Sequence, residues 1–107
     1  MCLVEEPLSR AEAEHLLEQK VGGAFLIRKK SQNSDTYVIS AKPTRDQISQ
    51  GVRKYSHCGV GEMMFKDEKY YYLRKGEGFA SLLELIVHHK EEFGLHYPVH
   101  HNGKYYP

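Results

Sequence analysis

The sequence has no tryptophan, only two cysteines and no long apolar run. Cys2 and Cys58 are too few for a disulfide framework, so we expect the reduced thiols of an intracellular domain. No apolar run approaches the roughly 18 residues that a membrane span requires, and the N-terminus lacks the layout of a signal peptide. We therefore expect a cytoplasmic protein that does not insert into membranes.

The chain also lacks an excess of charge of one sign. Its 107 residues include 15 basic and 14 acidic side chains, which gives a net charge of +1 with neutral histidines. Such a balance provides no overall attraction to nucleic acids or to anionic membrane surfaces. Any function that depends on cations must therefore come from a few residues gathered locally.

Motifs for metal binding and catalysis are missing as well. His88 and His89 are adjacent on a predicted helix, where neighbours point about 100° apart, so the pair cannot share a metal ion. His57 and Cys58 are adjacent on a predicted strand and should face opposite sides, so they cannot act as a base and a nucleophile. The Gly59–Gly61 turn is not followed by the lysine and hydroxyl residue of a phosphate-binding loop. We expect no metal site, no cofactor and no catalytic residue, although a longer parent protein could be a kinase, a phosphatase or an adaptor.

Arg28 stands at the end of the most informative stretch that is present. Residues 24–27 are all apolar and predict a strand buried on both faces, which Arg28 then closes. A guanidinium cannot lose its charge, and burying it costs several kcal/mol unless an anion meets it. Either a carboxylate of this protein, such as Asp35 or Glu12, neutralises Arg28, or the site receives an anion from outside. Two lysines and a serine follow at residues 29–31, and these donors suit a phosphate group.

The local signals alternate between helix, strands and helix. The sequences Ser9-Arg10-Ala11-Glu12 and Ser81-Leu82-Leu83-Glu84 are capping boxes, which predict helices to about residue 20 and residue 92. The second helix should bury Leu82, Leu83, Leu85, Ile86 and Val87 and end at Gly94. Between the helices, residues 31–35 predict a turn and residues 43–51 a polar loop. Strands are predicted at residues 24–30, 36–41, 52–58, 63–65 and 70–73, with a last extended piece at 95–99.

This order predicts an α+β fold with a central antiparallel β-sheet flanked by two α-helices. At this length we expect a single domain over residues 1–107, because typical domains run about 100–150 residues. Its core should span about residues 8–99, and residues 100–107 form a tail or linker.

Six segments of the chain together resemble a Src-homology-2 (SH2) domain. They are L-S-R-A-E-A-E-H-L-L, G-A-F-L-I-R, T-Y-V-I-S-A-K, V-R-K-Y, F-A-S-L-L-E-L-I-V-H-H and L-H-Y-P-V, in this order over about residues 8–99. The resemblance implies a module that binds phosphotyrosine-containing peptides of signalling proteins. It also implies a phosphotyrosine pocket on one side of the sheet and, on the other, a second pocket for residues C-terminal to the phosphotyrosine. The family's usual tryptophan near the start is absent, and Leu3 stands about there.

The resemblance also implies which residues bind the phosphotyrosine. Arg28 would grip the phosphate in bidentate fashion, and Arg10 would reach both the phosphate and the tyrosine ring. Lys54 stands where the family usually has a histidine beside the ring, so this chain would have a fixed cation there. The remaining phosphate donors would be Lys30, Ser31 and the backbone amides of Gln32 and Asn33.

The same resemblance implies residues for peptide specificity. Tyr55 resembles the residue between the two pockets, and Leu73, Arg74 and Lys75 lead into the loop that lines the downstream pocket. Ser56 replaces a frequent lysine. The cations at 74 and 75 have two interpretations: exposed residues of a solvated turn, or a site that favours acidic residues in the peptide.

Other binding functions are compatible with the same residues. One alternative is a domain of the same fold that binds a peptide without any need for phosphorylation. A single-stranded RNA binder would use Arg28, Lys30 and Lys54 with the tyrosines of residues 70–72 as a stacking surface, although the near-neutral charge speaks against nucleic acid. We expect tyrosine-phosphorylated peptides or proteins as partners, no nucleic acid, and a monomer.

Overall fold

The computed structural model describes residues 8–30, 36–52 and 54–100. A four-stranded sheet has the order β3-β2-β1-β6, and a separate two-stranded sheet is formed by β4 and β5. The strands β1, β2 and β3 are antiparallel neighbours, whereas β6 lies parallel to β1. The elements are α1 (Arg10–Glu18), β1 (Ala24–Lys29), β2 (Tyr37–Ala41), α2 (Arg45–Ser49), β3 (Ser56–Gly59), β4 (Gly61–Phe65), β5 (Glu68–Tyr72), α3 (Leu82–Phe93) and β6 (Tyr97–Pro98).

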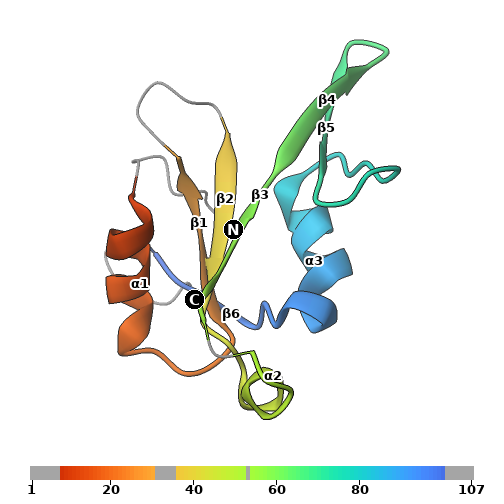
Figure 1. Cartoon of the computed structure of the whole chain (residues 1–107). Helices are drawn as coiled ribbons and strands as arrows, with labels where there is room; N and C mark the ends of the chain where they lie inside the picture. The colour runs from red at the N-terminus through yellow and green to blue at the C-terminus, as the bar shows by residue number, and fades with distance from the viewer. Residues whose placement is uncertain (1–7, 31–35, 53, 101–107) are drawn as a thin grey trace.

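The helices α1 and α3 lie on opposite sides of the large sheet (Figure 1). On the α1 side, Leu17 packs with Leu26 of β1 in one buried cluster. On the α3 side, Leu85 packs with Phe25 and Ile27 of the same strand in a second cluster. Successive residues of β1 therefore enter different cores, which is why this strand is apolar throughout. The predicted α+β fold and the strand buried on both faces are confirmed.

The helix boundaries follow from the capping residues. At α1 the Glu12 backbone amide donates to the Ser9 hydroxyl at 3.1 Å, and the Ser9 amide donates back to the Glu12 carboxylate at 3.0 Å. At α3 the Glu84 amide likewise donates to the Ser81 hydroxyl, at 3.1 Å. Gly94 then ends α3 with a φ of 66°, a left-handed conformation that glycine adopts without a steric penalty.

The hairpin β4–β5 agrees with the predicted pair of short strands. Its turn residues Lys66 and Asp67 both have positive φ values, 49° and 66°. Two such residues in a row form the turn that matches the twist of an antiparallel hairpin. The hairpin continues from the end of β3 and lies on the α3 side of the molecule (Figure 1).

Several local predictions are wrong. The expected loop at residues 43–51 contains the short helix α2, which Thr44 and Gln47 begin with a capping box of their own. The third strand starts at Ser56 rather than at residue 52. Leu83 and Val87, expected to be buried, are 49% and 65% exposed, because α3 places one face against the sheet and these residues lie on the other. The predicted turn at residues 31–35 lies outside the described residues.

Candidate functional site

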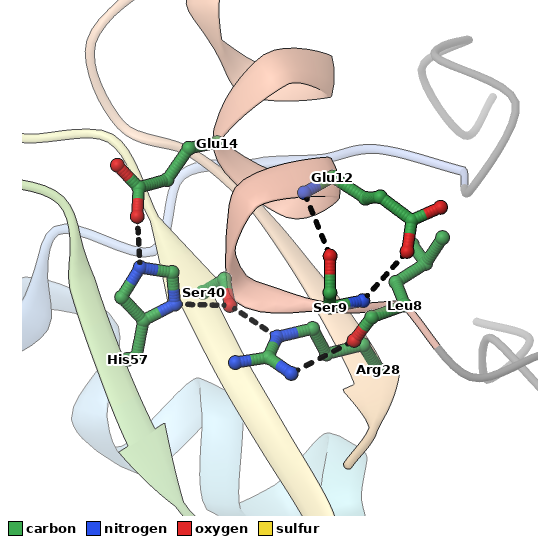
Figure 2. A network of polar contacts seen from close by, with 7 residues as sticks. All are labelled: Leu8, Ser9, Glu12, Glu14, Arg28, Ser40 and His57. Carbon is green, nitrogen blue, oxygen red and sulfur yellow. Dashed lines mark hydrogen bonds and ion pairs between the residues drawn. The ribbon is translucent and has the colours of Figure 1, made fainter. Parts of the chain in front are cut away.

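Arg28 lies in β1 with its side chain on the face that α1 covers, two residues after Leu26. Only 6% of the residue is exposed. Its Nε donates to the Ser40 hydroxyl at 3.0 Å, and its Nη1 donates to the carbonyl of Leu8 at 2.8 Å (Figure 2). These two bonds fix the plane of the guanidinium, and they are its hydrogen bonds to the part of the chain that the structure describes.

A chain of hydrogen bonds links Arg28 to α1 (Figure 2). Since the Ser40 hydroxyl accepts from Arg28, it can donate its own hydrogen to His57 Nδ1, which is 2.8 Å away. His57 Nε2 then donates to the carboxylate of Glu14 at 3.0 Å. This arrangement fits a neutral imidazole with its hydrogen on Nε2, and it holds the guanidinium and the imidazole in a fixed relative position.

Burial dominates the electrostatics of both groups. It lowers the pKa of Arg28, the nearby Arg10 lowers it further, and Glu14 opposes the change. Burial likewise lowers the pKa of His57, and the hydrogen bond to Glu14 opposes that effect. A guanidinium keeps its charge at any physiological pH, so Arg28 is a buried cation beside a neutral histidine.

No carboxylate among the described residues forms an ion pair with Arg28. The Glu12 carboxylate accepts from the Ser9 amide at the start of α1 instead. Glu14 reaches Arg28 only through His57 and Ser40. Neutralisation by Glu12 is therefore wrong, and Asp35 lies outside the described residues.

Arg28 forms part of the wall of a pocket of about 550 Å³, which we call the arginine pocket. Three cationic side chains line it, Arg10 from α1, Arg28 from β1 and Lys30 just after β1, with no carboxylate among its described lining residues. The other lining residues are Ser9, Thr36, Val38, His57 and Gly59. Converging cations with forked N–H donors are suited to a multiply charged oxyanion. The predicted donors Ser31, Gln32 and Asn33 lie outside the described residues.

Lys54 and Tyr55 do not line the arginine pocket. They precede β3 and line a neighbouring hollow of about 700 Å³, which shares Arg10 and His57 with the pocket. The histidine on the third strand beside Arg28 is His57, so the placement of Lys54 in the histidine's position on this strand is wrong. The resemblance implied a strand that includes residues 52–55, whereas β3 begins only at Ser56.

Apart from Tyr55, the residues predicted for peptide specificity lie near α3. Leu73 lines a small cavity together with Cys58 and Phe93. Arg74 forms an ion pair with Glu92 and lies over the Phe93 ring, 5.7 Å from its centre, so its charge is already partnered. Burial raises the pKa of the Cys58 thiol, which lies on the opposite side of β3 from the His57 contacts. The prediction that these two neighbours face opposite sides is confirmed.

Ser40, His57 and Glu14 were not among the predicted site residues. Glu14 follows Arg10 by four residues, a spacing that puts both on one helix face. His57 pairs with Ser40 across the β2–β3 register, and the sequence alone does not reveal that pairing. Within the described ranges, no group of three or more histidine, cysteine or acidic residues is placed to hold a metal ion, and no helix is long and apolar enough to cross a membrane.

A mainly antiparallel sheet covered by one helix on each face, with a cationic pocket on one side, defines a small α+β recognition module. The family model described as SH2 domain matches residues 5–89. The chain is also 33% identical over 100 residues to human 1-phosphatidylinositol 4,5-bisphosphate phosphodiesterase gamma-2. That alignment covers 88% of this chain but only 7% of the relative. The chain belongs to the SH2 domain family, whose members are non-catalytic modules that bind phosphotyrosine peptides in signalling.

Proposed function

We propose that Arg28 holds the phosphate of a phosphotyrosine at the base of the arginine pocket. The observation that carries this proposal is a 6% exposed guanidinium with no ion-paired carboxylate among the described residues, in the wall of a pocket with two further cations. A phosphotyrosine supplies about −1.5 to −2 charge and three acceptor oxygens. Two parallel N–H groups of a guanidinium can bind two of these oxygens, a geometry that lysine cannot provide.

The neighbouring side chains complete this assignment. Arg10 contacts the phosphate and the tyrosine ring from α1, where a cation over the ring contributes roughly 0.5–2 kcal/mol. Lys30, Ser31 and the amides of Gln32 and Asn33, which follow β1 in the sequence, add donors. His57 positions Arg28 through Ser40, at the 3.0 and 2.8 Å distances already described.

Peptide residues C-terminal to the phosphotyrosine would cross the sheet toward α3. Leu73 and Lys75 lie on that side and are proposed to contact them, while Arg74 contributes less because it pairs with Glu92. Tyr55, which lines the α1 side, is proposed to contact the peptide beside the phosphotyrosine. The partners would be tyrosine-phosphorylated proteins met in the cytoplasm, bound by one monomeric domain that spans residues 1–107.

Calorimetry with three forms of one peptide tests this function. The phosphotyrosine form should bind, and the forms with tyrosine or phosphoserine should bind at least tenfold more weakly, because one lacks the phosphate and the other is too short to reach Arg28. Equal binding of the plain tyrosine peptide would replace the proposal with a phosphorylation-independent peptide binder.

A single-stranded RNA binder is separated by its response to salt. If RNA were the ligand, a mixed-sequence oligonucleotide would bind more tightly than the phosphopeptide, and its affinity would fall steeply with ionic strength. We expect the phosphopeptide to bind more tightly at physiological salt. The opposite order would contradict the proposed function.

A further inference from the structure

A second hollow lies between α1 and the segment that carries α2, and we call it the α1–α2 hollow. It has a volume of about 700 Å³. Its lining residues come from α1, from the chain after β2, from α2 and from the residues around the start of β3: Arg10, Glu14, Lys42, Pro43, Ile48, Lys54, Tyr55 and His57. The short helix α2 supplies the wall through Ile48, so the hollow depends on the element that sequence analysis missed.

The charges around this hollow are predominantly positive. Arg10, Lys42 and Lys54 are cations, and Glu14 is the one carboxylate among the described lining residues. Glu14 already accepts a hydrogen bond from His57. The Lys42 ammonium donates to the carbonyls of Glu18 and Lys20 at 2.8 and 2.7 Å, which fixes its position without neutralising its charge.

Arg10 and Lys54 are exposed, and neither forms an ion pair with another described residue. They contrast with Arg74 on the α3 side, whose charge is partnered by Glu92. The other wall of the α1–α2 hollow is apolar, with Pro43 and Ile48. A ligand that fits both walls is a flexible chain that carries negative charge, as an acidic peptide segment does.

The α1–α2 hollow adjoins the arginine pocket. Arg10 and His57 line both, so a peptide whose phosphotyrosine occupies the pocket passes within a few residues of the hollow. An extended peptide advances about 3.3 Å per residue, so the three positions next to the phosphotyrosine span about 10 Å, and we assign these positions to the adjoining hollow. Residues after the phosphotyrosine are proposed to run toward α3, and the hollow lies on the α1 side. The residues that reach it are therefore those before the phosphotyrosine.

We propose that the α1–α2 hollow binds an acidic side chain at one of the three peptide positions that precede the phosphotyrosine. This inference rests on the proposed function. Lys54 and Arg10 supply the attraction, and Lys54 is the better probe because it does not line the arginine pocket. The proposal therefore assigns the preference for acidic peptide residues to Lys54 and Arg10 on the α1 side. The sequence analysis had linked it to the cations at 74 and 75, near α3.

Two matched phosphopeptide series test the proposal. One places glutamate at each of the three preceding positions in turn, and the other places glutamine there. Glutamate should strengthen binding by about two- to fivefold at one or more of these positions, as expected for a solvent-exposed ion pair, and the gain should shrink with added salt. Lys54→Ala should remove the gain. Lys75→Ala is the control, because it removes the same charge from the α3 side and should leave the gain unchanged.

Charge reversal provides a second measurement. Lys54→Glu should favour a peptide with lysine at the sensitive position over one with glutamate. An acidic gain that survives Lys54→Ala, or that is absent from the wild-type protein while phosphotyrosine binding persists, would overturn the inference alone. If the phosphate itself made no difference to binding, the proposed function would fail instead, so the two failures are distinguishable.

Discussion

Arg28 combines two properties that rarely occur together, since it is nearly buried and its described contacts are neutral groups. Ser40 and the Leu8 carbonyl fix its orientation, but neither carries a charge. A buried guanidinium is stabilised far more by an anion than by neutral acceptors. The geometry of Arg28 is therefore suited to the external anion that we propose for the arginine pocket.

Ser40 is the bridge of this arrangement, and its hydroxyl is fully buried. Ser40→Ala would leave Arg28 Nε and His57 Nδ1 without their shared partner. We expect a loss of about 1–3 kcal/mol in the free energy of unfolding, the cost of unsatisfied buried polar groups, together with weaker phosphopeptide binding. Urea denaturation and calorimetry would measure both. The control Ser49→Ala removes an exposed hydroxyl of α2 and should change neither by more than about 0.5 kcal/mol.

His57 predicts a pH dependence of stability. Burial lowers its pKa in the folded protein below the ordinary value of 6.5, so the unfolded chain binds a proton more readily than the folded one. The stability that the neutral imidazole contributes is thus fully present above about pH 6.5 and is lost as the pH falls through the folded pKa.

We expect denaturation midpoints of the wild-type protein to fall between about pH 7.5 and pH 5.5 more than those of His57→Gln, which cannot titrate there. His15→Gln is the control, because His15 is an exposed histidine of α1 that touches Glu18 at the surface. Parallel pH profiles for the wild-type protein and His57→Gln would contradict the assignment of a neutral, buried His57.

How much of the site the sequence reveals depends on the residue. Arg28 can be recognised in the sequence because it is a charged residue at the end of an apolar run. A charge in a buried strand requires a counter-ion or a ligand. Ser40 carries no such signal, since a serine in a strand is ordinary until the register places it beside an arginine. His57 is missed for a related reason, because its contact with the Arg28 site follows from its pairing with Ser40 in the β2–β3 register. The expected strand start at residue 52, in place of Ser56, puts Lys54 on the strand instead.

Among the helices, α1 and α3 can be predicted from the sequence, whereas the five-residue helix α2 was not predicted. The helices α1 and α3 and the strands β1 and β2 have strong capping or apolar signals and lie within a few residues of their predicted bounds. The five residues of α2 are too few for an apolar face to repeat, although Thr44 and Gln47 form a capping box. This capping signal in a polar segment was the one available clue.

Gly94 tests how α3 ends against α2. Its φ of 66° is strained for alanine, and an added Cβ would lie 2.9 Å from Thr44 Cγ2 and 2.8 Å from Gln47 Oε1. Gly51 also has a positive φ, 96°, but an added Cβ there would meet no atom within 4 Å. We expect Gly51→Ala to cost roughly 1–2 kcal/mol of unfolding free energy and Gly94→Ala about 1–3 kcal/mol more. Equal losses in chemical denaturation would show that α3 and α2 do not pack closely.

At the scale of the whole molecule, β1 joins two cores into one unit. Leu26 belongs to the α1-side cluster and Leu85 of α3 to the other, and both are almost fully buried. Leu26→Ala and Leu85→Ala should each cost about 2–5 kcal/mol, and each variant should still unfold in one transition because the clusters share a strand. Separate transitions for fluorescence and circular dichroism would contradict this single cooperative core.

The distribution of charge over the molecule is consistent with the proposed anion site in a nearly neutral chain. The net charge is +1, yet three cations line the arginine pocket and three line the α1–α2 hollow, with Arg10 common to both. The electrostatic field at a pocket depends on the charges that lie close to it more than on the net charge of the chain. The balanced composition therefore gives no overall attraction to nucleic acid, and it is compatible with a local anion site.

The most direct test of the central claim is the calorimetric affinity of one phosphotyrosine peptide for Arg28→Lys. This variant keeps a positive charge but loses the forked N–H groups, and Arg45→Lys on α2 makes the same change at an exposed site. Circular dichroism and thermal unfolding would verify that both variants are folded. We expect Arg28→Lys to lose on the order of 2–5 kcal/mol, about thirtyfold or more in Kd, and Arg45→Lys to bind like the wild-type protein. An unchanged Kd for folded Arg28→Lys would contradict the claim that Arg28 holds the phosphate.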